Sequence, residues 1–223
     1  MSQTRPTRKR PDLSARGDES RVAILDAART LFAKDGFRGT SLGSVAELAG
    51  LSQAGLLHHF PSKPALLLAV LAERDREDGR LSSAKLSRRG LEILPALGTL
   101  VEHNQTTPEL IRLFSVLLGE GVAPDNPGHD YFVNRYEQIR DRIARNLRLA
   151  ETAGEINPGH DLDTIAALLV AVLDGLQYQW LLNEQIDMVR AYNLIADLLM
   201  KELVSAPPAA RPERRSDPEG ERS

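Results

Sequence analysis

Apolar residues recur three and four positions apart along nearly the whole chain between residues 20 and 205, which is the spacing of one helix face. The first clear set is Ile24, Ala27, Ala28, Leu31 and Phe32. This set predicts a helix over 20–34 that ends at Gly36. No alternation of apolar and polar residues of useful length for a strand occurs, and aromatic residues make up only 4%. The pattern therefore predicts an all-α fold.

Two short helices are expected directly after the first one. Thr40 or Ser41 supplies a hydroxyl cap for the second helix, and Gly50 closes it. Ser52 then caps a third helix over 53–59. A pair of short helices joined by a glycine turn is typical of the helix-turn-helix motif.

The second helix of such a motif enters the major groove of DNA and reads base edges with its exposed side chains. We expect Leu57 and Phe60 to pack inward. The side chains predicted to face DNA are Ser52, Gln53, Ala54, Leu56, His58 and His59. Helix pairs with a glycine turn are also common in all-α cores, so the spacing alone leaves a purely structural role open.

Positive charge is concentrated near the N-terminus, although the net charge of the chain is −3. The first 64 residues hold ten Lys/Arg and six Asp/Glu, whereas the remainder is acidic. This asymmetry favours a polyanion-binding end. Residues 1–18 are predicted to be a disordered basic arm. The alternative explanation of the charge asymmetry is that this basic arm has no function. Residues 206–223 are predicted to be a disordered tail.

The larger C-terminal part also shows helical periodicity, broken at proline and glycine residues. The predicted helices are 63–87, 89–104, 108–122, 129–154, 162–184 and 187–203. The helix over 162–184 is apolar on most sides, so it is covered either by its own domain or by a partner subunit. With the helix over 187–203 it would contribute to a four-helix bundle between two subunits.

Several classes of protein are excluded by what the sequence lacks. There is no cysteine, so disulfides and thiolate sites are absent. The longest apolar run covers nine residues, 165–173, and the N-terminus has no apolar signal region, which predicts a soluble, cytoplasmic protein without a membrane span. We predict no catalytic residue, cofactor or metal. A metal site built from His129, Asp130, His160 and Asp161 is the weaker alternative.

Four motifs stand close together in the stretch 27–66: Ala-Ala-Arg-Thr-Leu-Phe, Gly-Phe-Arg-Gly-Thr-Ser, Val-Ala-Glu-Leu-Ala-Gly-Leu-Ser and Leu-Leu-His-His-Phe-Pro-Ser-Lys. With these motifs the stretch resembles the DNA-binding domain of the TetR family of transcriptional regulators. The resemblance implies an all-helical dimer of about nine helices that usually represses transcription. It also implies a helix-turn-helix domain over 19–64 and an effector-binding and dimerisation domain over 65–205.

By position, the resemblance implies that Thr40 and Lys63 contact DNA phosphates, with Ser41 and Ser52 beside them. It likewise implies that Gln53, Ala54 and Leu56 face bases, where Leu56 would reach a thymine methyl group or else be a packing residue. The family usually has tyrosine where this chain has His58. We therefore expect His58 and His59 to contact the DNA backbone as imidazole donors, or else to be surface residues packed on the next helix.

Two further sets of residues are assigned to the C-terminal domain. The predicted effector pocket contains His103, Asn104, Phe114, Phe132, Tyr136, Gln177 and Tyr178, unless these residues are simply core. The predicted dimer interface contains Leu169, Val172, Leu176, Trp180, Tyr192, Ile195 and Leu199. The stretch 174–182 is similar to the TetR subgroup typified by the choline-pathway repressor.

The expected function is that of a ligand-responsive dimeric regulator, most simply a repressor. It would bind a near-palindromic DNA operator as a homodimer and be released by an unknown small-molecule effector. The alternative is a DNA-binding dimer without effector control.

Overall fold

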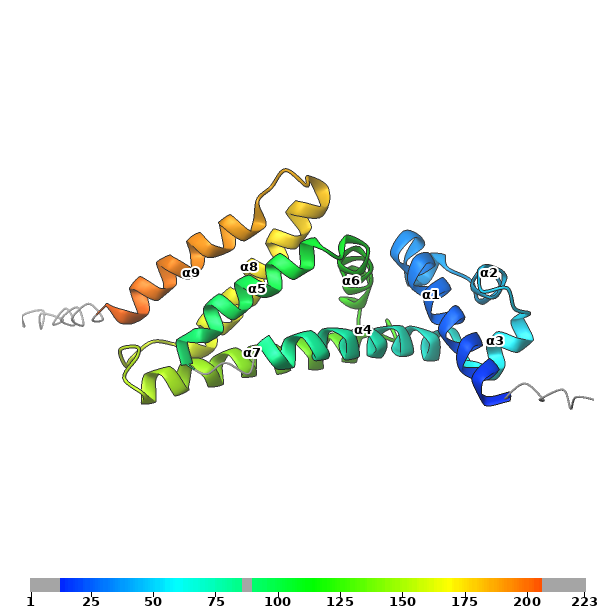
Figure 1. Cartoon of the computed structure of the whole chain (residues 1–223), viewed down its shortest axis with the longest axis horizontal. Helices are drawn as coiled ribbons and strands as arrows, with labels where there is room; N and C mark the ends of the chain where they lie inside the picture. The colour runs from blue at the N-terminus through cyan, green and yellow to red at the C-terminus, as the bar shows by residue number, and fades with distance from the viewer. Residues whose placement is uncertain (1–12, 86–89, 206–223) are drawn as a thin grey trace, which may run out of the picture.

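The computed structural model describes residues 13–85 and 90–205, and every regular element in these ranges is a helix (Figure 1). This confirms the all-α prediction. The helices are α1 (Leu13–Gly39), α2 (Leu42–Leu48), α3 (Gln53–His59), α4 (Lys63–Lys85), α5 (Ile93–Gln105), α6 (Pro108–Gly121), α7 (His129–Thr152), α8 (Leu162–Leu182) and α9 (Met188–Val204). A short 3₁₀ turn, η1 (Gly90–Glu92), precedes α5.

Helix α1 begins earlier than the sequence suggested. It starts at Leu13, so residues 13–18, which we assigned to a disordered arm, are helical. Gly36, with φ 72° and ψ 176°, interrupts the helical conformation where the first helix was expected to end. The rest of the predicted arm and the predicted tail lie outside the described residues.

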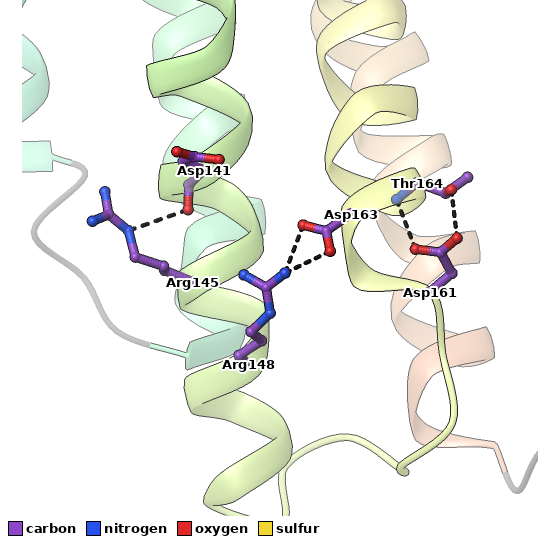
Figure 2. Close-up of polar contacts among 6 residues, drawn as sticks. All are labelled: Asp141, Arg145, Arg148, Asp161, Asp163 and Thr164. Atoms are coloured by element: carbon purple, nitrogen blue, oxygen red, sulfur yellow. Dashed lines mark hydrogen bonds and ion pairs between the residues drawn. The ribbon is translucent and has the colours of Figure 1, made fainter.

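Hydroxyl and carboxylate caps fix the starts of several helices. Ser41 caps α2, because its Oγ accepts a hydrogen bond from the Ser44 amide at 3.0 Å. Ser52 caps α3. Asp161 caps α8 by accepting hydrogen bonds from the amide and the hydroxyl of Thr164 at 3.1 and 2.7 Å, and these bonds lower the pKa of Asp161 (Figure 2). Each cap satisfies an amide that has no partner within its helix.

We call α1, α2 and α3 the head, and the helices from α5 onward the body; α4 leads from one to the other (Figure 1). The head core is built on Ile24, Phe32, Val45 and Leu56 and continues into the start of α4. It also includes four buried residues from the body: Leu113, Phe114, Leu117 and Phe132. The apolar core therefore does not divide at residue 64, where the predicted domain boundary lies.

The body core joins α5, α7, α8 and α9. Tyr192 of α9 is fully buried there and donates its hydroxyl hydrogen bond to the Leu94 carbonyl at 2.8 Å. Arg148 of α7 pairs with Asp163 of α8 at 2.6 Å on the surface of the same bundle (Figure 2). By length and composition, α8 is the one helix within the described ranges that could cross a bilayer. In this structure it packs along α7 and α9.

Candidate nucleic-acid interface

Helices α2 and α3 are each seven residues long and meet through a tight turn. Gly50 has a φ of 70°, a conformation that L-residues avoid, and it lets the chain reverse between the two helices. The Leu51 amide then donates to the Ala46 carbonyl at 2.9 Å. Val45 and Ala46 of α2 and Leu56 of α3 are buried in the head core. This arrangement is a helix-turn-helix whose second helix has one buried side.

The structure corrects the predicted orientation of α3. Leu56, which we expected to face DNA, is fully buried, whereas Leu57, which we expected to pack inward, is 38% exposed. Both Leu56 and Leu57 lie one helical turn from Phe60, so the spacing fits either choice. In the structure it is Leu56 that packs in the head core, and Phe60 is buried as expected.

The remaining residues of α3 form an exposed surface as expected. Ser52, Gln53, Ala54 and His58 are exposed, and His59 is half-buried. The two imidazole rings meet edge to face with centroids 5.6 Å apart in the last turn of the helix. The surface that α3 offers to a partner therefore carries one amide, two imidazoles and the apolar side chain of Leu57.

Thr40 lies in the turn between α1 and α2. Its side chain is buried, and its hydroxyl donates to the Gly36 carbonyl at 2.8 Å. Contact of Thr40 with a phosphate stays a prediction. The neighbouring Ser41 is exposed, although its Oγ also caps α2.

Lys63 lies at the start of α4 and is half-buried. Its Nζ donates to the Arg38 carbonyl at 3.2 Å and lies 4.6 Å from the centroid of the Phe37 ring. Burial lowers the pKa of Lys63, and the nearby Glu120 carboxylate acts in the opposite direction. The ammonium group thus joins α4 to the end of α1, whatever else it contacts.

Arginines that the sequence analysis did not single out also lie on the head. The Arg21 guanidinium stacks 4.7 Å from the centroid of Phe60, at the end of α3. Arg38 is exposed and makes a surface ion pair with Asp125 at 3.5 Å. The only signal in the sequence was the excess of basic residues over the first 64 positions, which does not identify individual side chains.

The predicted effector residues fall into three groups. Tyr136 donates its hydroxyl hydrogen bond to Asp174 Oδ2 at 2.6 Å, and Tyr178 donates to the Ser115 carbonyl at 3.1 Å, so these residues meet where α6, α7 and α8 converge. Burial, together with the Asp174 carboxylate, raises the pKa of both tyrosines. Asp174 was not among the predicted residues, although it is a charged residue on an apolar helix.

The second group is aromatic, and the third lies at the end of α5. Phe114 and Phe132 form an edge-to-face pair with centroids 5.5 Å apart and belong to the head core. The carbonyls of His103 and Asn104 accept hydrogen bonds from the turn that leads into α6. Gln177 is half-buried on α8.

A groove of about 740 Å³ lies elsewhere, between α1 and the start of α6. Its lining residues are Arg29, Thr30, Ala33, Lys34, Thr106, Thr107, Pro108, Glu109, Leu110, Arg112 and Leu113. None of the predicted effector residues lines it.

The predicted dimer residues divide by burial. Leu169, Trp180 and Tyr192 are buried in the body core of their own chain, so they are corrected from interface to core. Val172, Leu176 and Leu199 are half-buried, and Ile195 is exposed. The apolar residues that stand out from α8 and α9 are Leu168, Leu182, Leu194, Leu198 and Val204, each more than half exposed.

The residues of the weaker metal alternative are not gathered into a site. Within residues 13–85 and 90–205, no group of three or more metal-ligating side chains occurs. Asp161 serves instead as the cap of α8.

Comparison with known proteins agrees with this geometry. A model of bacterial regulatory proteins of the tetR family matches residues 24–70, and a model of the C-terminal part of BetI-type transcriptional repressors matches residues 96–204. Together they account for more than half of the chain.

Among curated proteins, the HTH-type transcriptional regulator RutR of Escherichia coli K12 is 42% identical over 104 residues, which cover 45% of this chain and 48% of RutR. The chain thus matches about half the length of that relative. The repressor AcnR of Corynebacterium jeikeium is 26% identical over 162 residues, covering 71% of this chain and 79% of AcnR.

A crystal structure described as a putative TetR-family regulator from Rhodococcus sp. superposes with a TM-score of 0.65 at 26% identity. The superposition covers 84% of this chain and all of the other. With a helix-turn-helix at its N-terminal end and a BetI-type helical body, the chain belongs to the TetR family of bacterial transcriptional regulators.

Proposed function

We propose that this protein is a dimeric, effector-controlled regulator that binds DNA through α2 and α3. The observation that carries the proposal is the division of α3 into two sides. Leu56 and Phe60 anchor the helix in the head core, while Gln53, Leu57 and His58 stand exposed on a rod narrow enough for the major groove.

Each exposed residue of α3 has a distinct role in this proposal. Gln53 suits a bidentate hydrogen bond to an adenine edge, and Leu57 suits apolar contact with a thymine methyl group. His58 and His59 donate hydrogen bonds to the DNA backbone, as do Ser41 and Ser52 at the starts of α2 and α3. Lys63 adds positive charge near the same end of the head.

Dimerisation is supported by the exposed leucines of α8 and α9. Leu168, Leu194 and Leu198 are each more than half exposed, although they lie on helices that otherwise build the core. Exposed large apolar side chains that gather into a patch mark an interface between proteins, and we propose that these leucines form one. A second copy packed on this face would form a four-helix bundle and bring two heads to successive major grooves, about 34–36 Å apart.

Effector control is supported by the polar cluster formed by Tyr136, Asp174 and Tyr178. Small-molecule sites combine an apolar wall with a few oriented polar groups, and this junction of three helices holds such polar groups. An effector that prefers a wider separation of the heads would lower the population that fits DNA. Couplings of this kind are worth about 1–3 kcal/mol, so the expected change in affinity is severalfold to a hundredfold.

The direct test is to capture genomic fragments from the source organism with the purified protein and sequence them. We expect a near-palindromic site, to which Gln53→Ala binds more weakly by about 1–3 kcal/mol, mainly through one base position per half-site. Gln138→Ala, an exposed glutamine of α7, is the matched control and should bind normally. Failure of the protein to retain any fragment at low salt would refute the proposal.

Effector control needs a separate measurement. A thermal-shift screen of small metabolites should find compounds that raise the melting temperature, and these compounds should release a labelled operator. If no compound changes DNA affinity, the protein is instead a DNA-binding dimer without effector control.

A further inference from the structure

The head and the body are joined by a carboxylate that bridges two distant parts of the chain. Glu120, at the end of α6, accepts hydrogen bonds from the backbone amides of Phe37 and Arg38. Its Oε2 lies 2.6 Å from the Phe37 nitrogen, and its Oε1 lies 3.1 Å from the Arg38 nitrogen. We call these two hydrogen bonds the Glu120 clamp. Both are charge-assisted, which makes them strong and directional.

The backbone at Gly36 is what allows the clamp to form. Its φ of 72° interrupts the helical conformation of α1 just before Phe37, and the next two amides donate to Glu120. A Cβ atom at position 36 would lie only 2.7 Å from Glu120 Oε1. A side chain at position 36 would therefore require the Glu120 carboxylate to shift from this position.

Lys63 extends the clamp to a third helix. Its Nζ binds the Arg38 carbonyl, so Arg38 is held through its amide by α6 and through its carbonyl by α4. The Phe37 ring lies beneath the same ammonium group. The segment from Phe37 to Arg38 is thus fixed from two sides by ionic groups.

This segment is the entrance to the helix-turn-helix. Two residues later Thr40 closes onto Gly36, and Ser41 then caps α2, which packs on α3. Five residues before Glu120, the Ser115 carbonyl of α6 accepts a hydrogen bond from Tyr178 of α8. Helix α6 is therefore bonded both to α8 and to the segment that leads into α2 and α3.

We propose that Glu120 is a positioning residue for DNA binding, which sets the orientation of each head on the body and hence the separation of the two heads. The proposal rests on the DNA-binding function proposed above. Apolar residues of α1 and α6 share the head core and hold the two helices together. The clamp adds two directional, charge-assisted hydrogen bonds to this packing.

The test compares binding to a complete operator with binding to a single half-site, by fluorescence anisotropy. Glu120→Ala should weaken binding to the complete operator about tenfold, a change typical of coupling between sites, and should leave half-site affinity unchanged within about twofold. It should also tolerate operators whose half-sites are moved apart by one or two base pairs. Glu120→Gln keeps the size of the side chain and one acceptor oxygen, so its effect should be smaller.

Glu109→Ala removes an exposed glutamate from the other end of α6 and serves as the matched control, with wild-type binding to both DNAs. A direct readout comes from spin labels. Because the chain has no cysteine, Glu47→Cys places one label on the exposed side of α2 in each protomer. The distance distribution between labels in the free dimer should broaden when Glu120 is replaced by alanine or glutamine.

Equal losses for the complete operator and the half-site would assign Glu120 a purely structural role and overturn the proposal. Unchanged binding together with an unchanged label distance would also overturn it. If the wild-type protein itself binds no operator, the proposed DNA-binding function fails instead, and the label distances still report whether the clamp orients the heads.

Discussion

Replacing Gly36 with alanine tests the geometry at the joint between head and body most directly. The φ and ψ of 72° and 176° lie in a region that essentially only glycine occupies, and an L-residue there costs about 1–3 kcal/mol. The new Cβ would also lie 2.7 Å from Glu120 Oε1 and force the carboxylate away from its two amides. Losing a hydrogen bond to a charged group adds about 1.5–3 kcal/mol. We therefore expect Gly36→Ala to lower the free energy of unfolding by about 3–5 kcal/mol.

Two other glycines separate these contributions. Gly50 has a similar φ of 70°, but no atom lies within 4 Å of the position that an added Cβ would take, so Gly50→Ala should cost only the conformational part, about 1–2 kcal/mol. Gly119 lies within α6 with open space around it, so Gly119→Ala should stabilise the protein by about 0.5–1 kcal/mol. The measurement is guanidinium denaturation followed by circular dichroism at one protein concentration. A cost for Gly36→Ala no greater than that for Gly50→Ala would refute the role given to the close contact.

Three further predictions address the head, the exposed apolar face and a helix cap. Leu56→Ala should destabilise the protein by about 2–5 kcal/mol because a buried side chain is lost. Leu57→Ala should change stability by less than about 0.5 kcal/mol and weaken operator binding. Equal destabilisation by the two substitutions would contradict the orientation of α3. Leu194→Glu should prevent formation of the proposed dimer, so that light scattering gives the mass of a monomer, while Leu149→Glu, on an exposed part of α7, should not. Asp161→Asn should lower the melting temperature at pH 7, and this difference should shrink as the pH falls below the ordinary aspartate pKa. The lowered pKa of Asp161 means that its stabilising contribution is present above the ordinary aspartate pKa and is lost as the pH falls through the lowered value, so a difference that does not shrink with falling pH would contradict this assignment.

The positions of the helices were largely accessible from the sequence because proline, glycine and capping residues mark their ends. Pro108 begins α6, and Ser41 and Ser52 cap α2 and α3 as predicted. The start of α1 was missed because charged residues and Gly17 were interpreted as disorder. A helix end that lacks apolar periodicity is not marked by the local sequence.

The candidate site was less accessible, because several of its features depend on contacts between distant segments. Leu56 and Leu57 fit the helical repeat equally well, and only the packing of α3 against the rest of the head distinguishes them. The repeat also shows that Tyr192 is apolar-facing without showing whether its own chain or another covers it. Glu120 lies 83 residues from Phe37 in the sequence, and no local sequence pattern near either residue predicts their contact.

The mixed core of the head has a consequence for building hybrid regulators from members of this family. Leu113, Phe114, Leu117 and Phe132 are contributed to that core by helices that follow residue 100. A chimaera made by grafting a foreign N-terminal segment onto this chain near residue 64 would place new side chains against these four without adjusting them. Transfer of DNA specificity should therefore succeed more often when only the exposed positions of α3 are exchanged than when the whole segment is replaced.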